Sequence, residues 1–273
     1  MATSSRPVED VTRSLGESLL PLGFEVYPLK VGWYNAVLSE AFHLPYPEDT
    51  LAVVVLSAPG MFEKAFLPFL KAHSGGGLHD YIDQCTAHCI SSAVTSCFSG
   101  RPVDISYDYE MHPNRKPKFL AQTATHVAGA AYYYQQSDVP DPPWGNKKMF
   151  GVCIHPRLGG WFAVRALLVF KDVRVGEEEL CQQAAPLDCV RSREERIELL
   201  ERFNLRWQDG TYRDIIQAEE SYSQQQREYF TTAPGERVAL LKRWGYLSGS
   251  TTETETETES QPDTRHGCEL SHG

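Results

Sequence analysis

The side chain that is hardest to explain by packing alone is Arg165. It lies in the apolar stretch Trp161–Phe170, whose period-two pattern predicts a strand. One face of that strand would carry Trp161, Ala163, Arg165, Leu167 and Val169. A guanidinium on such a face is costly unless an anion or several acceptors meet it. Two explanations stay open: an internal salt bridge to Asp or Glu, or a bound carboxylate or phosphate, which arginine holds bidentately.

Two further arginines are candidates for the same chemistry. Arg213 stands in the run Thr-Tyr-Arg-Asp, and Arg237 stands in Gly-Glu-Arg-Val. Each has an acidic neighbour, Asp214 or Glu236, that could pair with it inside the protein. The case for an internal ion pair is therefore stronger for these two than for Arg165.

A segment of small residues followed by tyrosines could receive a flat ligand. His126 lies in a helical stretch, residues 128–131 are all Ala or Gly, and three tyrosines follow at 132–134. Small side chains let a flat group approach the backbone, but they also let two helices pack closely. Three consecutive tyrosines cannot share one helix face, so at least one ring points elsewhere. A ligand pocket and an ordinary core both fit this pattern.

Potential metal ligands are few. Cys85, His88 and Cys89 lie close together, but a zinc site usually needs a second such pair, and none follows. Buried cysteine acting as a small hydrophobic residue is the favoured interpretation. His155 opens the loop His155–Gly160, where Pro156 fixes φ and two glycines permit a positive φ or a close approach. No metal site is predicted, and no side chain is assigned as a catalytic acid or base.

The common cofactor and nucleophile motifs are absent from the sequence. It contains no G-x-x-x-x-G-K-[ST] phosphate loop, no G-x-G-x-x-G, no G-x-S-x-G and no H-E-x-x-H. A flavin or nucleotide would have to be held by other means.

The elements that position these residues follow from hydrophobic periodicity. Helices are expected over 8–19, 61–70, 82–93 and 118–134, and helical patterns dominate 191–246. Strands are expected over 24–31, 51–58, 103–109, 150–154 and 161–170, the last two joined as a hairpin-like unit by residues 155–160. This mixture favours an α+β fold with an antiparallel sheet over a doubly wound parallel one.

Composition narrows the class of protein further. The chain has 273 residues, 41% of them hydrophobic, and a net charge of −10, of which the Thr/Glu-rich segment 248–273 carries half. This charge argues against nucleic acid or an anionic membrane as a partner. No apolar run is long enough to span a bilayer, the N-terminal 25 residues do not form a signal peptide, and the seven cysteines are scattered. We expect a cytoplasmic protein with one domain over 1–247, its C-terminal part (about 191–247) helical, and a disordered acidic tail over 248–273.

Four segments together resemble one known family. They are Phe-Glu-Val-Tyr-Pro at 24–28, Tyr-Glu-Met-His-Pro-Asn-Arg at 109–115, the Ala- and Tyr-rich stretch 121–134, and residues 151–165 with His-Pro-Arg-Leu-Gly-Gly-Trp-Phe-Ala. They look like the animal cobalamin C family, the vitamin B12 processing proteins of methylmalonic aciduria and homocystinuria type C. The similarity runs from about residue 11 to residue 247.

The resemblance implies a flavin nitroreductase-like fold with a C-terminal helical cap over the ligand. It implies two activities: reductive decyanation of cyanocobalamin with reduced FAD or FMN, and glutathione-dependent dealkylation of alkylcobalamins. Cobalamin would bind with its own base off cobalt and without a protein nitrogen in its place, so His155 would be structural. The implied partners are a cobalamin D-type protein, methionine synthase and its reductase, and the resemblance leaves room for a homodimer that forms on ligand binding.

The resemblance also implies site residues, by position. The corrin would contact Asp108, Phe119, Leu120, Ala121, Gln122, Tyr133, Tyr134, Gln135, Cys153 and Val164. Glutathione, which carries two carboxylates, would be held by Arg165, Arg213 and Arg237. Two features depart from the family pattern: Gly210 stands where an aromatic residue is expected, and the acidic tail replaces one rich in Pro and Ser.

Two other functions remain as alternatives. One is a flavin reductase of the nitroreductase type that binds no corrinoid. The other is a cobalamin carrier that shields and delivers its ligand without catalysis.

Overall fold

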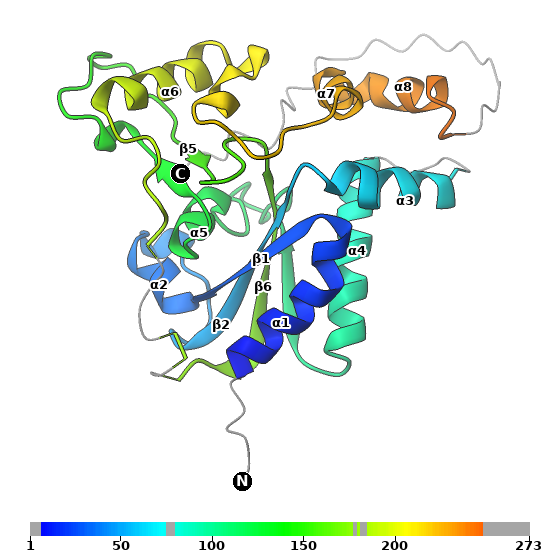
Figure 1. The fold of residues 1–273 in the computed structure, drawn as a ribbon. Coiled ribbons are helices and arrows are strands. Elements are labelled where there is room, and N and C mark those ends of the chain that lie inside the picture. Colours follow the sequence, from blue (N-terminus) through cyan, green and yellow to red (C-terminus); the bar gives the residue numbers. More distant parts are fainter. Residues whose placement is uncertain (1–6, 75–79, 177–178, 181–184, 248–273) are drawn as a thin grey trace.

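The structure, a computed structural model, describes residues 7–74, 80–176, 179–180 and 185–247. Its centre is a four-stranded antiparallel sheet in the order β1-β2-β6-β3 (Figure 1). The strands are β1 (Phe24–Lys30), β2 (Thr50–Ser57), β3 (Val103–Tyr107) and β6 (Ala163–Arg174). The predicted α+β fold with an antiparallel sheet is confirmed, and the arrangement is consistent with the nitroreductase-like fold that the resemblance implies.

Helices cover both faces of this sheet because its inner strands are apolar on both sides. All eight residues of β2 are buried, as its continuous hydrophobic run predicts. On one face lie α1 (Pro7–Leu19), α3 (Leu67–Ala72) and α4 (Tyr81–Cys97), and on the other lie α2 (Val31–Ala36) and α5 (Ala121–Val127) (Figure 1). We call the two hydrophobic clusters the α1–α4 core, which includes Leu15, Phe66, Ile90 and Phe170, and the α2–α5 core, which includes Tyr34, Val54, Ala124 and Leu167.

A second, two-stranded sheet pairs β4 (Tyr132–Tyr134) with β5 (Val152–Ile154). The predicted helix over 118–134 is therefore wrong beyond Val127. Gly129 adopts a φ of 76°, which ends the helical path, and the tyrosines then continue as a strand, which aromatic residues favour. Because side chains alternate along a strand, the three rings are divided between two sides.

The predicted hairpin between residues 150–154 and 161–170 is also wrong. The strand β5 pairs with β4, whereas β6 pairs with β2 and β3. The intervening loop is closed instead by a single antiparallel bridge between His155 and Gly159. The loop thus joins the small sheet to the large one.

The C-terminal region is helical, as predicted. It contains α6 (Arg193–Leu205), α7 (Gln224–Thr231) and α8 (Arg237–Arg243). Residues of α6 pack with both strands of the small sheet in a third cluster, the α6 core, whereas Tyr229, Leu240 and Leu241 belong to the α1–α4 core. Short helical turns complete the fold: η1 (Leu20–Leu22), η2 (Glu40–Phe42), η3 (Phe62–Phe66), η4 (Gln136–Asp138), η5 (Trp207–Asp209), η6 (Thr211–Asp214) and η7 (Pro234–Glu236).

Two further expectations concern membrane-spanning helices and the C-terminal tail. In the part of the chain that the structure describes, no helix has the length and apolar character needed to cross a bilayer. The expected disordered tail, 248–273, lies outside the described residues.

Candidate functional site

Arg165 lies at an irregularity of the sheet. Val55 pairs with Ala166 and Leu56 pairs with Val164, so Arg165 is the extra residue of a β-bulge. The predicted alternation is interrupted here, and Arg165 does not share the apolar environment of Leu167, which packs in the α2–α5 core. Bulges redirect side chains at the ends of strands. This one lets a charged residue occupy an otherwise apolar strand.

The guanidinium of Arg165 is buried but has few protein partners. The side chain is 7% exposed, and its Nε donates a hydrogen bond to Ser57 Oγ at 2.9 Å. Among the described residues it forms no direct ion pair. Asp83 on α4 and Asp108 after β3 act on it only electrostatically. The direct internal salt bridge is therefore not the explanation, and the terminal nitrogens of Arg165 are available to an anion.

Burial raises the pKa values of the two acids near Arg165. Burial raises the pKa of Asp83 to about 7, with a further contribution from the charge of Asp80 and opposition from Arg165. Burial likewise raises the pKa of Asp108 to about 6, again against the pull of Arg165. Both carboxyl groups therefore have higher pKa values than exposed aspartates.

Arg237 on α8 approaches the same acids. Its Nη1 lies 3.9 Å from Asp80 Oδ2, and its guanidinium carbon lies 5.0 Å from the ring centre of Tyr229. Asp83 is within electrostatic range of both Arg237 and Arg165. The structure therefore brings two of the three predicted arginines together around α4.

Arg213 lies in η6, against the loop that follows β5. Its guanidinium donates to the Gly160 carbonyl and lies 4.9 Å from the ring centre of Tyr212 and 5.5 Å from that of Trp161. The Gly160 amide donates to the Arg213 carbonyl at 2.9 Å. A Cβ on Gly159 would lie 2.4 Å from that carbonyl oxygen, so the glycine pair is needed for the close approach of η6.

Aromatic rings connect Arg213 with Arg237. The guanidinium of Arg213 lies 5.4 Å from the ring centre of Tyr222, which lies 5.4 Å from that of Phe230, and Arg237 lies 5.8 Å from Phe230. Sequence reasoning missed Arg227 on α7, which lies 4.2 Å over Trp161. It sits in a polar Gln-Gln-Gln-Arg run that carries no signal of a site.

Six of the ten predicted corrin-contacting residues gather in one place, in or against the α2–α5 core. They are Phe119, Leu120, Ala121, Tyr133, Cys153 and Val164. Gln122 joins them through its carbonyl, which accepts a hydrogen bond from Cys153 Sγ at 3.5 Å. Phe119, Leu120, Ala121 and Cys153 are buried in this core, and Tyr133 and Val164 are half-buried against it.

The remaining three predicted corrin contacts lie in other surroundings. Asp108 lies beside the charged cluster of Arg165. Gln135 is exposed and caps η4 together with Asp138. Tyr134 is fully buried in the α6 core, so its ring faces away from that of Tyr133.

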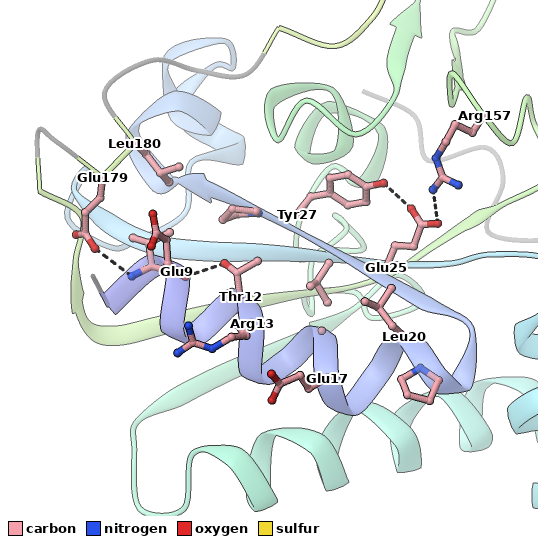
Figure 2. Close-up of a pocket in the computed structure, with 15 residues that line it drawn as sticks. Glu9, Thr12, Arg13, Glu17, Leu20, Glu25, Tyr27, Arg157, Glu179 and Leu180 are labelled. Atoms are coloured by element: carbon pink, nitrogen blue, oxygen red, sulfur yellow. Dashed lines mark hydrogen bonds and ion pairs between the residues drawn. The ribbon is translucent and has the colours of Figure 1, made fainter. Parts of the chain in front are cut away.

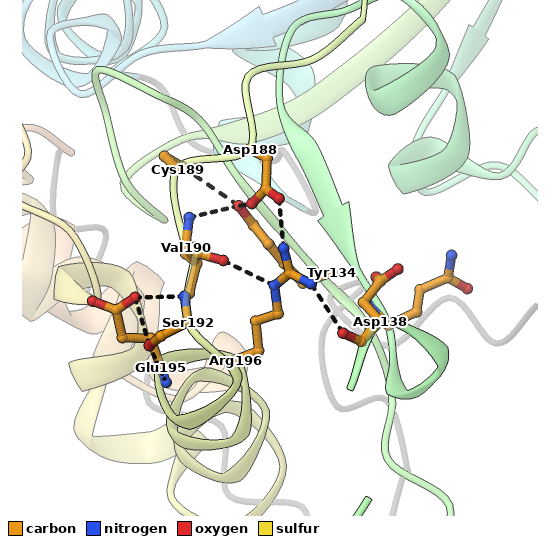
Figure 3. Close-up of polar contacts among 9 residues, drawn as sticks. Tyr134, Asp138, Asp188, Cys189, Val190, Ser192, Glu195 and Arg196 are labelled. Carbon is orange, nitrogen blue, oxygen red and sulfur yellow. Dashed lines mark hydrogen bonds and ion pairs between the residues drawn. The ribbon is translucent and has the colours of Figure 1, made fainter. Parts of the chain in front are cut away.

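Figure 3 shows how the hydroxyl of Tyr134 is used. It donates to Asp188 Oδ1 at 2.8 Å and accepts from the Val190 amide at 2.8 Å, and Asp188 in turn pairs with Arg196 on α6. These bonds attach α6 to β4. Tyr134 thereby fixes the strand that presents Tyr133 on the opposite side.

His155 is buried, and both of its ring nitrogens have partners. Its Nδ1 accepts from the amides of Arg157 and Leu158, and its Nε2 lies 3.0 Å from the hydroxyl of Tyr27. Two amide donors at Nδ1 assign the proton to Nε2. The ring therefore has a structural role in its loop.

The hydroxyl of Tyr27 continues this network to Glu25, which also pairs with Arg157 at 2.7 Å (Figure 2). Burial alone would raise the pKa of Glu25, but hydrogen bonds from His155, Tyr27 and Arg157 lower it to about 2. This network borders a groove of about 890 Å³ between α1 and β1 (Figure 2). None of the predicted site residues lines that groove.

The structure also gives ordinary roles to the other candidate metal ligands, His126, Cys85 and Cys89. His126 Nδ1 accepts a hydrogen bond from the Tyr133 amide at 3.0 Å, and Cys85 and Cys89 are buried. In the described ranges, no group of three or more His, Cys, Asp or Glu side chains could hold a metal ion. The favoured interpretation of the cysteines, as small buried residues, is confirmed.

Comparison with known proteins identifies the family. The sequence model of the Methylmalonic aciduria and homocystinuria type C family matches residues 23–241, most of the chain. This chain belongs to that family. The resemblance drawn from the four sequence segments is thereby confirmed.

Curated relatives extend over nearly the same length. A protein of Danio rerio named cyanocobalamin reductase / alkylcobalamin dealkylase is 64% identical over 91% of this chain and 98% of its own. A human protein of the same name is 49% identical over 86% of this chain and 82% of its own. The fold is also similar to the crystal structure of a B12-trafficking protein CblC of C. elegans, with a TM-score of 0.79 and 30% identity over 90% of this chain and 98% of that one.

Proposed function

We propose that this chain acts on cobalamins as its relatives are named to do, as a cyanocobalamin reductase and an alkylcobalamin dealkylase. The observation that carries the proposal is its 64% identity, over 91% of the chain, to a protein of that name. The similarity covers the sheet, the arginines and the C-terminal helices together, and not one isolated motif. The structure adds a buried arginine, Arg165, that forms no direct ion pair with any residue the structure describes.

Cobalamin is the substrate, and we propose that its corrin lies over the α2–α5 core near Phe119–Gln122, Tyr133, Cys153 and Val164. The corrin binds with its own base displaced from cobalt. The engagement of both nitrogens of His155 supports this, because coordination of cobalt would cost the imidazole either the two amide donors at Nδ1 or the contact of Nε2 with Tyr27. A weak lower axial position favours reduction of cobalt, since a nitrogen donor there stabilises the higher oxidation state.

Glutathione is the cosubstrate of dealkylation, and we propose that Arg165, Arg213 and Arg237 hold it. Its two carboxylates need more than one guanidinium, and clustered positive charge also favours the thiolate over the thiol. The thiolate attacks the alkyl carbon bound to cobalt, a C–S bond forms, and the pair of electrons of the Co–C bond stays on cobalt. Holding sulfur and carbon in line supplies the advantage of an intramolecular displacement.

Decyanation takes its electrons from reduced FAD or FMN. No glycine-rich phosphate loop or other recognisable flavin site occurs in the described part of the chain, so no residue is assigned to the flavin. We propose further that 1–247 form one cytoplasmic domain whose C-terminal helices close over the ligand. Its product passes to a cobalamin D-type protein and to methionine synthase with its reductase.

The test of the arginine assignment is an Arg165→Gln variant assayed for both reactions. We expect glutathione-dependent dealkylation of methylcobalamin to fall by about 10²-fold or more, while flavin-driven decyanation keeps much of its rate. Arg243→Gln, on the exposed face of α8, is the matched control and should change neither reaction. Equal loss of both reactions, or of neither, from a folded Arg165→Gln protein would overturn the role of Arg165 in binding glutathione.

A further inference from the structure

We propose that Asp83 is the proton acceptor for the thiol of the cosubstrate. This rests on the proposed thiol-dependent dealkylation and adds to it a step that the arginines cannot perform. A guanidinium stabilises a thiolate but cannot receive its proton, because arginine stays protonated in proteins. The proton of each thiol that reacts must therefore pass to another group.

Asp83 is the carboxylate of this cluster that the protein leaves unused. Asp80 caps α4 by accepting from the amides of Ile82 and Asp83 at 3.1 and 3.3 Å, and it also faces Arg237. The carboxylate of Asp83 itself makes no hydrogen bond or ion pair within the described residues. It lies one turn into α4, partly buried, with both of its oxygens free to accept.

Charged and polar groups from several elements act on this carboxylate electrostatically. Arg165 of β6 and Arg237 of α8 act on it as positive charges, and Asp80 and Asp108 act on it as negative ones. The hydroxyls of Tyr109 after β3 and Tyr229 of α7 also lie within its electrostatic range. The carboxylate thus lies within electrostatic range of the two arginines of the proposed thiol site and of Asp108, the residue implied to contact the corrin.

Two other atoms indicate that a polar ligand belongs here. Thr86 Oγ1, one turn beyond Asp83 on α4, is buried and has no hydrogen-bond partner in the described structure. The same holds for Gln226 Oε1, one turn before Tyr229 on α7. Buried polar atoms are rarely left unpaired. Hydrogen bonds to a peptide-like cosubstrate between α4 and α7 would satisfy both.

The proposed step balances in atoms and electrons. The S–H bond breaks and its proton moves to the carboxylate of Asp83, while the sulfur electrons form the new S–C bond to the alkyl group. The Co–C bond breaks with both electrons remaining on cobalt, which goes from Co(III) to Co(I). The products are a thioether, cob(I)alamin and a protonated Asp83, which returns its proton to water when the thioether leaves.

The surroundings suit Asp83 to this exchange. Burial raises the pKa of Asp83 toward that of an ordinary thiol, which makes this carboxylate a better proton acceptor than an exposed one. An unperturbed carboxylate would be too weak a base. Burial, which raises the pKa of Asp83, is therefore what makes it effective.

The test uses the full-length Asp83→Asn variant, with Asp172→Asn on the exposed face of β6 as the matched control. Dealkylation of methylcobalamin by glutathione should fall by about 10²-fold or more, with decyanation by reduced flavin retained. The rate of the unaltered protein with glutathione should rise with pH through about 7, and this limb should be absent from Asp83→Asn. Asp172→Asn should behave as the unaltered protein does.

A cosubstrate with a selenol in place of the thiol separates proton transfer from binding. A selenol is already ionised at neutral pH, so Asp83→Asn should dealkylate with it at a rate close to that of the unaltered protein. Asp83→Ala offers a second check, because added formate should restore part of its rate with glutathione.

Four results would overturn the proposal. They are an unchanged rate with glutathione, an equal loss with thiol and selenol, an unaltered pH profile, and no response of Asp83→Ala to formate. If the unaltered protein itself fails to dealkylate with glutathione, the proposed function falls with it. A failure confined to the Asp83 variants removes this inference alone.

Discussion

At the scale of single residues, His155 shows how a suggestive side chain can be fully explained by its surroundings. An imidazole beside a proline and paired glycines suggests a metal ligand. The loop instead uses Nδ1 to bind two of its own amides and Nε2 to reach Tyr27. Withdrawing the ring would leave those amides unpaired in a buried site, which is costly.

The first prediction concerns His155→Ala. It should lower the free energy of unfolding by about 1–3 kcal/mol, because two buried amides lose their acceptor. The electron spin resonance spectrum of bound cob(II)alamin should stay the same and show no nitrogen ligand from the protein. Exposed His112→Ala is the control and should change neither property. A nitrogen signal that disappears only in His155→Ala would show that the imidazole coordinates cobalt.

A second prediction at this scale concerns the stability of Asp83→Asn as a function of pH. The folded state raises the pKa of Asp83 to about 7 from its ordinary 3.8, so between these values the folded protein holds a proton that the unfolded chain has lost. Stability therefore falls as pH rises from about 4 to 7, and the penalty is complete above 7. A neutral Asn at position 83 does not carry this loss of stability.

We expect Asp83→Asn to be more stable than the unaltered protein at pH 8, by on the order of 1–3 kcal/mol, and nearly equal to it at pH 4. Thermal unfolding at a series of pH values measures the difference. A difference that does not change with pH would mean that the carboxyl group is not buried as the structure places it.

At the scale of elements, the loop after β5 and the turn η6 are fitted to each other. Gly159 has a φ of 57° and faces the Arg213 carbonyl, and a Cβ on Gly160 would lie 2.8 Å from the Arg213 Cα. The position of the Arg213 guanidinium therefore depends on two residues that have no side chain of their own.

The third prediction is that Gly160→Ala displaces η6. Overpacking against a backbone atom should cost about 1–3 kcal/mol of stability. Gly235→Ala is the control, since nothing lies within 4 Å of the added methyl group there. If Arg213 holds glutathione, dealkylation should decline more than decyanation in Gly160→Ala. A variant as stable and active as Gly235→Ala would contradict the close contact.

Some helices and strands could be predicted from the sequence alone, and others could not. Regular periodicity was sufficient for α1 and α4, which each bury one face, and a continuous apolar run was sufficient for β2, which is buried on both faces. It failed after Val127, where one glycine ends the helix and the tyrosines find a partner in β5, only three residues long. Such pairing depends on residues about twenty positions away, and no local pattern carries it.

The candidate site was predicted in part, for the same reason. Arg165 was conspicuous because its charge conflicts with the apolar strand around it. The bulge that places it was not visible, since it arises from a shift of register against β2. Asp83 gave no signal at all, because its surroundings come from α4, β6, α7 and α8, which meet only in the folded protein.

At the scale of the whole molecule, the C-terminal helices share a core with the N-terminal ones. Leu240 and Leu241 of α8 and Tyr229 of α7 belong to the same hydrophobic core as Leu15 of α1 and Phe66 of η3. The same helices bring Arg237 to the charged cluster. A substitution that weakens the packing of α7 and α8 should therefore affect both the stability of the fold and the position of Arg237.

The fourth prediction follows from this sharing and concerns Leu240→Ala. Removing a fully buried leucine should lower the stability of the protein by about 2–5 kcal/mol. If residues 1–247 fold as one domain, the loss appears everywhere at once, because unfolding is cooperative. Hydrogen exchange in rising denaturant should show amides of α1 and α8 opening at the same lowered midpoint. Val238→Ala, on the exposed side of α8, should leave both midpoints within about 0.5 kcal/mol of the original.

The alternative is that α7 and α8 form a lid that opens by itself. In that case Leu240→Ala would lower the denaturant midpoint of hydrogen exchange for the amides of α8 and leave the midpoint for α1 unchanged, since local opening does not expose the rest of the core. The sharing of the α1–α4 core argues against this, because Leu240 and Leu241 are completely buried in it and Tyr229 of α7 packs against the rings of Phe62 and Phe66. We therefore expect α8 to remain in place until the whole domain unfolds, and Arg237 to remain beside Asp80 with it.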